Sequence, residues 1–381
     1  MKELDFARER ERFPSMVDRA FFAMQCMGAF PREMLDDLDE YRQSLVLRNR
    51  AIDGWLERLD EMPRLIADLL DVHADDVMLR SDATGAHAAI AASIHPRGER
   101  RRIVISTADF HSTRYLWTAQ AARGFEIVEV DANGPEHALA ETYLPHIDER
   151  TAIVALSLVS PRSGAMLDVK PLVEHAHRMG ALVVLDAYQA VGVVPIAPRA
   201  LDVDVLVGGN HKWLGSAGSG IAFAYVAPSF SKTHVPAYPG WIGHSSMIGF
   251  DEAYVPAQGA RRFQQGTPPM EPIYTARAGL KFVRECGIDA LRARSLILTQ
   301  RLIDAVDRHH LTLRTPREAQ ARGGMIVLDV PDADAIADAL ADQRIDVDAR
   351  RGAGLRIGPH PCVSFDECDR VIAAVANYLG H

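Results

Sequence analysis

Between residues 75 and 230 the chain alternates short, β-branched apolar runs with segments of helical periodicity, and this alternation restricts the possible folds more than any other feature. Six runs stand out: RRIVIST, FEIVEVD, TAIVALSLV, ALVVLDA, VDVLVGG and GIAFAYV. Continuous apolar strands separated by helices are typical of a largely parallel sheet that is covered on both faces. The sequence therefore predicts an α/β fold.

The flanking segments predict two further parts. Residues 1–70 have helical spacing in MLDDLDEYRQSL and WLERLDEMPRLIADLL, whereas residues 231–272 are rich in glycine, proline and aromatic side chains, as in a loop that forms a site. The end of the chain has the order β-α-β-β-α, from GGMIVLDV to FDECDRVIAAVANYL. We predict an N-terminal helical segment at 1–50 that packs with the small domain, a large domain at 51–275 and a small α/β C-terminal domain at 276–381.

Composition excludes several classes of protein. A net charge of −9 argues against nucleic acids and anionic membranes as partners, because both require clustered basic residues. No stretch reaches the roughly 18 apolar residues of a membrane helix, and MKELDFARER has no signal core. The four cysteines (Cys26, Cys286, Cys362 and Cys368) have neither CxxC nor zinc spacing. We therefore expect a cytoplasmic protein without a membrane anchor, a disulfide scaffold or a metal site.

Two polar residues follow apolar strands, where ligands of parallel sheets gather. Asp186 ends ALVVLD, and a carboxylate there needs a cation such as a protonated pyridine; taken alone, a turn or N-cap aspartate is the simpler interpretation. Lys212 follows DVLVGG and precedes the glycine-bearing loop GSAGSG. A primary amine held at a strand end is suited to Schiff-base chemistry, and only five lysines occur in the chain.

A third strand end, SDATGAH at 81–87, opens an apolar helical run. Thr84 and the amides of Gly85 and Ala86 would then lie at a helix N-terminus, which binds phosphate through free N–H groups and the helix dipole. An ordinary capping sequence would look the same.

Together these segments resemble pyridoxal phosphate (PLP) enzymes of fold type I, the class V aminotransferase group. The core signature is ALVVLDAYQAVGVVPI followed by DVLVGGNHKWLGSAGSGIAFAYV, and the segments GWIGH, RFQQGTPPM and GLRIG are most similar to kynureninases. The matches span roughly residues 80–360. The resemblance implies a large domain with a mostly parallel, seven-stranded sheet flanked by helices, and PLP as the cofactor.

The resemblance also assigns the cofactor site. Lys212 would carry PLP as a Schiff base, and Asp186 would pair with the ring nitrogen. The other expected contacts are Thr84, Gly85 and His211 on the phosphate, Phe110 stacked on the ring, and Gln189 near the phenolic oxygen. The alternative for Phe110 is a purely structural role in the core.

Three further residues have roles implied by the resemblance alone. Thr267 in the GTP segment would reach the phosphate of a neighbouring subunit, which implies a homodimer with shared active sites. Arg356 matches the arginine that binds the substrate α-carboxylate, and Trp241 matches a tryptophan of the substrate pocket. A structural salt bridge is the alternative for Arg356, and loop packing is the alternative for Trp241.

The chain departs from kynureninases at three positions. They usually carry a tyrosine where His211 stands, a histidine in place of Gln189 and an aspartate in place of Thr113. The His-Lys pair and the Asp-x-x-Gln spacing resemble cysteine desulfurases and selenocysteine lyases instead. That branch needs a nucleophilic cysteine on the loop before the carboxylate arginine, and IDVDARRGAG contains none.

The expected function is a PLP-dependent reaction on an α-amino acid. Kynureninase-like cleavage of the side chain, by a hydrolase or lyase, is favoured. Transamination or epimerisation by a class V aminotransferase-type enzyme is the alternative. A non-catalytic binding protein with the same fold is a third, and keeping Lys212, Asp186 and Arg356 together argues against it, because a binding protein needs no Schiff base.

Overall fold

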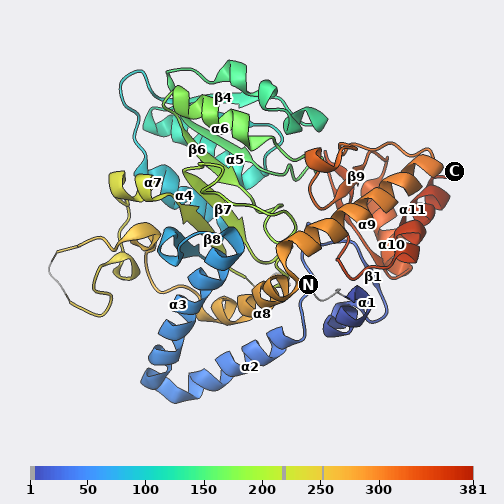
Figure 1. Cartoon of the computed structure of the whole chain (residues 1–381), viewed down its shortest axis with the longest axis horizontal. Coiled ribbons are helices and arrows are strands. Elements are labelled where there is room, and N and C mark those ends of the chain that lie inside the picture. Colours follow the sequence, from blue (N-terminus) through green and yellow to red (C-terminus); the bar gives the residue numbers. More distant parts are fainter. Residues whose placement is uncertain (1–4, 217–219, 251–252, 381) are drawn as a thin grey trace.

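The large layer of the protein is a seven-stranded mixed sheet. A computed structural model describes residues 5–216, 220–250 and 253–380 (Figure 1). Only β8 runs antiparallel to its neighbours, and all other adjacent strands of this sheet are parallel. The prediction of a mostly parallel, seven-stranded sheet is confirmed. In spatial order the strands are β2 (Val77–Arg80), β8 (Ala222–Val226), β7 (Val205–Gly209), β6 (Leu182–Asp186), β5 (Thr151–Ser157), β3 (Arg102–Ser106) and β4 (Glu126–Val130).

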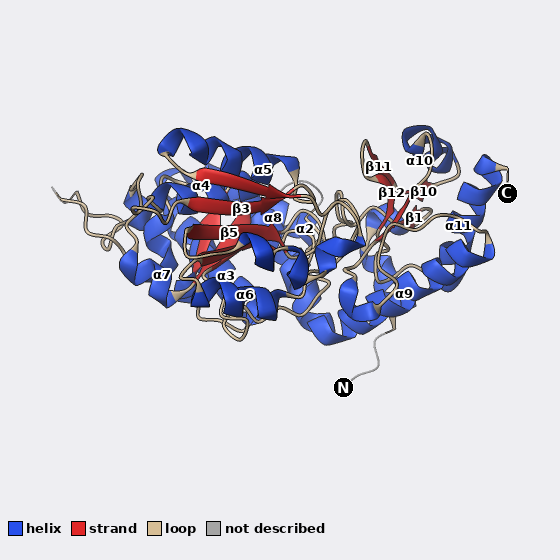
Figure 2. Cartoon of the chain, turned by 90° about the horizontal axis from the view of Figure 1, so that it is seen from above, coloured by secondary structure: helices blue, strands red, loops and turns tan. Residues whose placement is uncertain are grey.

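Helices cover both faces of this sheet, which explains why its strands are almost entirely apolar. Figure 2 shows α4 and α5 on one side of the strands and α6 on the other. Every residue of β3, β5, β7 and β8 is buried, whereas the edge strand β4 is only partly covered. The helices around the sheet are α3 (Ala51–Leu70), α4 (Ala83–Ser93), α5 (His111–Thr118), α6 (Val169–Arg178) and α7 (Pro228–Thr233).

The connectivity brings several strand ends to one edge. Because β2, β3, β5, β6 and β7 all run in the same direction, their carboxyl ends and the loops that follow them share that edge. Asp186 at the end of β6 is in register with Ser157 at the end of β5. Helices α4 and α5 begin at the same edge, after β2 and β3. Ligands of parallel sheets bind at such an edge.

The C-terminal part is a smaller α/β unit, as its β-α-β-β-α pattern predicts. Its antiparallel sheet has the order β11–β12–β9, and α9 packs against α11. Strand β1 (Ala20–Phe21) pairs in parallel with β10 (Ile345–Asp346). The remaining elements are α9 (Ile288–Arg308), β9 (Ile326–Leu328), α10 (Ala333–Asp342), β11 (Asp348–Arg350), β12 (Gly354–Ile357) and α11 (Phe365–Leu379).

The N-terminal segment contacts both units. Figure 1 shows α1 (Phe6–Glu9) and β1 beside the small unit, while α2 (Glu33–Ser44) and α3 pack against the long helix α8 (Met270–Cys286). The exact domain boundaries at 50 and 275 stay predictions. Among the residues that the structure describes, no helix combines the length and the apolar character needed to span a membrane.

Candidate active site

One cavity of about 800 Å³ opens at the carboxyl edge of the large sheet, where the small unit faces it. Most of the residues that the sequence predicts for the site line this cavity, although they come from segments as far apart as α4 and β12. These lining residues are Thr84, Phe110, Asp186, Gln189, His211, Lys212 and Arg356.

Three predicted residues lie elsewhere. The Gly85 N–H donates to Asp82 Oδ1 at 2.7 Å, so this amide is used to cap its own helix. The amides of Ala83 and Thr84 precede it in the first turn of α4. Thr267 is exposed and Trp241 is 38% exposed, and neither lines the cavity of its own chain. Their roles stay predictions.

Two aromatic rings lie near the Lys212 amine. Its Nζ is 5.5 Å from the ring centroid of Phe110 and 4.6 Å from that of Tyr188. Burial lowers the pKa of Lys212 to about 8, a shift that Asp186 opposes and Arg356 favours. A lysine with this pKa is partly neutral near pH 7, and the neutral amine is the nucleophilic form.

The N-terminal segment holds the lysine loop in place. The Gly28 N–H donates to the His211 carbonyl at 2.8 Å, and a Cβ at position 28 would lie 1.8 Å from the Lys212 carbonyl oxygen. Only glycine allows this approach. The loop on the other side of Lys212, GSAGSG, is described in part, because residues 217–219 lie outside the described residues.

Asp186 is a buried carboxylate with donors on both oxygens. The Tyr188 N–H donates to Oδ1 at 2.9 Å and the Thr113 hydroxyl donates to Oδ2 at 3.1 Å, while His87 Nε2 is 3.5 Å from Oδ2. Burial opposes ionisation, but His87, the Tyr188 amide and Lys212 outweigh it, so the pKa of Asp186 is below its usual value. Asp186 is therefore ionised and faces the cavity.

Tyr188 and His211 form a hydrogen-bonded pair beside the lysine. The Tyr188 hydroxyl is 2.8 Å from His211 Nδ1. Burial lowers the pKa of His211 to about 4 and raises that of Tyr188. A neutral imidazole and a protonated phenol fit one arrangement, in which Tyr188 donates to Nδ1 and His211 keeps its proton on Nε2. Gly209 provides the room, since a Cβ there would lie 2.2 Å from the Tyr188 ring.

Two hydrogen bonds fix the side chain of Gln189. Its Oε1 accepts from the Trp213 indole N–H at 3.1 Å, and its Nε2 donates to the Gln25 carbonyl at 2.9 Å. One N–H of the Gln189 amide is left for a ligand. Gln25 also donates to the Arg356 carbonyl at 3.1 Å, so the N-terminal segment ties both units to the site.

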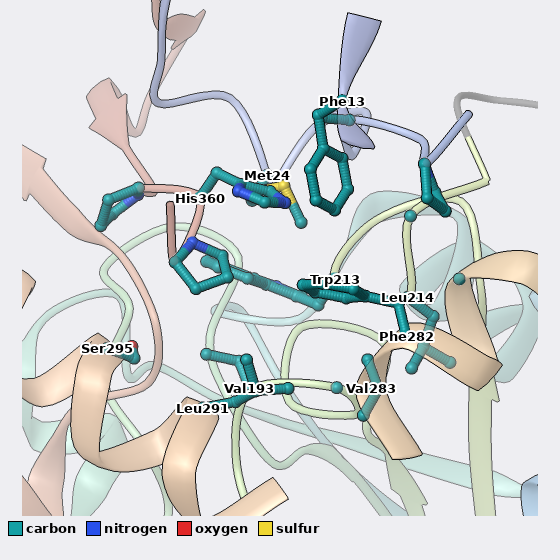
Figure 3. Close-up of a pocket in the computed structure, with 17 residues that line it drawn as sticks. Phe13, Met24, Val193, Trp213, Leu214, Phe282, Val283, Leu291, Ser295 and His360 are labelled. Carbon is teal, nitrogen blue, oxygen red and sulfur yellow. The ribbon is translucent and has the colours of Figure 1, made fainter. Parts of the chain in front are cut away.

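A second, much smaller cavity of about 30 Å³ lies behind Trp213. Figure 3 shows the Trp213 ring among apolar side chains of the N-terminal segment, α8 and α9. Burial lowers the pKa of His360 in its wall to about 3, so this side chain is neutral. Apart from Ser295 and His360, the side chains that line this cavity are apolar, so it is a packing feature.

Arg356 is positioned by the small sheet and by the loop after β5. Its Nε donates to Asp348 Oδ2 at 2.6 Å, a second nitrogen of the guanidinium contacts the same oxygen, and Nη1 donates to the Pro161 carbonyl at 3.0 Å. Asp348 lies opposite Arg356 in the β11–β12 ladder. A guanidinium has five N–H groups and these contacts use three of them, so one N–H on each terminal nitrogen is left for a carboxylate.

Several lining residues escaped the sequence interpretation. Tyr188 stands inside the core signature ALVVLDAYQAVGVVPI, where it had no assigned role, and Thr113 appeared only as a departure from kynureninases. Others come from segments with no motif: Arg162, Arg350 and Arg351. The arginine pair in DVDARRG was the one signal available for the last two.

The residues present suit PLP. An ionised, buried carboxylate at the end of β6 matches a ring nitrogen that must stay protonated, and a lysine of pKa about 8 matches an aldehyde. Thr84 at the N-terminus of α4 and the Nε2–H of His211 match a phosphate. Phe110 and Tyr188 offer flat apolar surfaces near the lysine nitrogen.

Comparisons with known proteins agree with this geometry. The chain is 29% identical over 349 residues to "Kynureninase" of Pseudomonas fluorescens, covering 88% of this chain and 82% of that protein. It is 26% identical to "Uncharacterized aminotransferase YcbU" of Bacillus subtilis (strain 168), over 96% of both chains. The apo cysteine desulfurase of Thermococcus onnurineus NA1 superposes with a TM-score of 0.87 over 100% of both chains at 19% identity, which confirms the fold-type I architecture.

The family follows from a match to most of the chain. The sequence profile described as "Aminotransferase class-V" matches residues 31–366. That range includes β2 to β12 and every predicted site residue. The chain therefore belongs to the class-V aminotransferase family and is a PLP-dependent enzyme, as its motifs predicted.

Proposed function

We propose that this enzyme binds an α-amino acid at Lys212 and cleaves its side chain, in the manner of a kynureninase-like hydrolase or lyase. One observation carries the proposal: Lys212, Asp186 and Arg356 line a single cavity. They supply an amine, a buried anion and a cation with free N–H groups. This set matches a cofactor aldehyde, a ring nitrogen and an α-carboxylate respectively.

Each residue has a separate task. PLP, when bound, supplies the electron sink that makes the α-proton of an amino acid acidic. Asp186 keeps a proton on the ring nitrogen by its negative charge. The neutral Lys212 amine accepts the α-proton and thereby becomes an ammonium, which can donate the proton back. Arg356 orients the amino acid through its carboxylate.

Tyr188 supplies a phenol that the sequence comparison had counted as missing. Kynureninases usually carry a tyrosine where this chain has His211, yet the Tyr188 hydroxyl lies 2.8 Å from His211 Nδ1. The pair is a hydrogen-bond relay, and both of its members line the cavity beside Lys212. We propose that Tyr188 and His211 together transfer a proton to the leaving side chain.

Cys26 lines the cavity, so a desulfurase-type thiol has to be considered. Burial, and secondly Asp348, raise the pKa of Cys26, although Arg350 donates to its Sγ at 3.2 Å. A protonated thiol is a poor nucleophile. This disfavours persulfide chemistry and supports cleavage that does not use a cysteine.

Transamination or epimerisation is the second candidate. Its support is the similarity to YcbU along 96% of both chains. Both reactions need the same three residues, and they differ only in where the proton goes after Lys212 takes it. A non-catalytic role finds no support in this set, because binding alone does not need an amine of lowered pKa.

Two further proposals concern the environment of the enzyme. We propose a homodimer with shared sites, in which the exposed Thr267 and Trp241 complete the cavity of the neighbouring subunit. We also propose the cytoplasm as its compartment, supported by four free cysteines.

The test is a product assay with the PLP-loaded enzyme. Kynurenine would be supplied and anthranilate measured, in parallel with a set of amino acids assayed for cleavage products and, with a 2-oxo acid present, for amino-group exchange. We expect cleavage of at least one amino acid and, at most, slow release of anthranilate, with no turnover in Lys212→Ala. Amino-group exchange without cleavage would replace the proposal with the second candidate.

A further inference from the structure

Three arginines line the cavity in addition to Arg356, and they are here called the arginine rim: Arg162, Arg350 and Arg351. Arg162 belongs to the loop after β5, whereas Arg350 ends β11 and Arg351 begins the turn that joins β11 to β12. The two groups meet across the cavity, because a Cβ on Gly352 would lie 3.9 Å from Arg162 Nη2.

The rim carries more positive charge than its surroundings compensate. Asp348 is the acidic partner of both Arg350, at 3.0 Å, and Arg356. Arg162 donates to the neutral Asn133 Oδ1 at 3.0 Å. Among the described residues, neither Arg162 nor Arg351 has a carboxylate within 4.0 Å. Four guanidinium groups therefore share one carboxylate.

The other carboxylates that line the cavity belong to its cofactor end. Each of them accepts backbone N–H groups. Asp82 accepts from Gly85, Asp109 accepts from Ser106 and Ser157, and Asp186 accepts from Tyr188. They are held at the ends of the large sheet. A bound substrate would bring one α-carboxylate to Arg356, and two guanidinium charges would still lack a counter-ion.

We infer that the enzyme selects amino acids whose side chain ends in an anionic group, such as a carboxylate or a sulfinate. This inference rests on the proposed function, because it assigns the side-chain half of the same cavity. A planar or tetrahedral oxyanion matches the guanidinium fork, and the low number of local carboxylates leaves the rim able to bind it. A neutral aromatic side chain such as that of kynurenine leaves these charges unmatched.

The test is a binding titration with isosteric pairs. The PLP-loaded enzyme would be titrated with L-glutamate against L-glutamine, and with L-aspartate against L-asparagine, following cofactor absorbance and, independently, heat of binding. We expect the acid of at least one pair to bind about tenfold more tightly than its amide, which is about 1.4 kcal/mol. The preference is expected to weaken as salt rises, since the rim is partly exposed.

Variants separate the rim from the rest of the site. In Arg162→Gln/Arg351→Gln the preference for the acid is expected to fall below about threefold, with amide binding unchanged, and Arg162→Lys/Arg351→Lys is expected to recover much of it. Arg178→Gln, an exposed arginine at the end of α6, is the matched control.

The outcomes distinguish the two claims. Equal binding of acid and amide, or a preference that the glutamine variant retains, overturns the inference and leaves the proposed function intact. If no amino acid changes either signal in an enzyme that carries PLP, the proposed function fails, and the rim inference fails with it.

Discussion

The cavity has two ends that differ in how they are built. The cofactor end is formed by loops that directly follow strands of one sheet, so Asp186 and Lys212 are placed by β6 and β7. The opposite end, with Arg356 and the arginine rim, is assembled from the loop after β5, the β11–β12 hairpin and the N-terminal segment. The first end is built on a single sheet, whereas the second depends on how the small unit is held.

The contacts at the second end show how it is held. Gln25 binds both Gln189 and the Arg356 backbone, and Pro161 accepts from the Arg356 guanidinium. These hydrogen bonds cross between segments more than 100 residues apart. We therefore expect substitutions at the cofactor end to affect every substrate alike, and substitutions at the other end to affect substrates according to their charge.

The largest effect is expected from Asp186→Asn. Removing the negative charge beside the ring nitrogen weakens the electron sink, and we expect kcat to fall about 10²–10³-fold for every substrate, with little change in the folded structure. Steady-state kinetics with two different amino acids would measure it. A loss confined to one substrate would break the distinction between the two ends.

The next effect is expected from Arg356→Gln. Losing the guanidinium removes the partner of the α-carboxylate, and we expect substrate Kd to rise about 10–10²-fold while PLP remains bound. Titrations with an amino acid and with its amide derivative, which has no carboxylate, would measure this. The two ligands are expected to bind the variant equally, and a retained preference for the free carboxylate would remove Arg356 from the account.

A smaller effect is expected from Tyr188→Phe. The change removes the hydroxyl that bonds to His211 but keeps the ring against Lys212, so we expect about 1 kcal/mol less stability and normal PLP content. If the pair transfers a proton, product formation is expected to slow about 10²-fold while α-proton exchange, followed by deuterium incorporation, continues. Equal slowing of both steps would assign Tyr188 to packing.

The smallest effect concerns pH. Lys212 has a lowered pKa of about 8, so its neutral fraction rises about tenfold per unit below pH 8 and levels off above it. The rate at which cofactor-free enzyme attaches PLP is expected to follow that curve. Asp186 raises this pKa, so Asp186→Asn is expected to move the inflection to lower pH. An inflection near 10.5 would show a lysine in ordinary surroundings.

The sequence predicted the cofactor end better than the substrate end, for a physical reason. Asp186, Lys212 and Thr84 follow apolar strands, and parallel strands bring such residues together without knowledge of tertiary contacts. The rim depends on a hairpin that docks against a distant loop, which no local pattern encodes. Tyr188 was missed because the phenol that seemed lost at His211 comes from the turn after the neighbouring strand, β6.

Three predicted residues do not line the cavity of their own chain. Thr267 was assigned to the phosphate of a neighbouring subunit and Trp241 to the substrate pocket, and both lie outside the cavity of their own subunit. Gly85 was read as a phosphate donor, but its amide is already used by Asp82, because a capping aspartate competes for the same group.

The central claim is that PLP is attached to Lys212, and the most direct measurement is to find the labelled lysine. The PLP-loaded enzyme would be treated with borohydride to trap the covalent linkage, digested and analysed by mass spectrometry, with Lys212→Arg as the control. The account predicts a phosphopyridoxyl group on the peptide that contains Lys212 and no label in the variant. A label on Lys170, Lys232 or Lys281, or no trapped cofactor in a yellow protein, would contradict it.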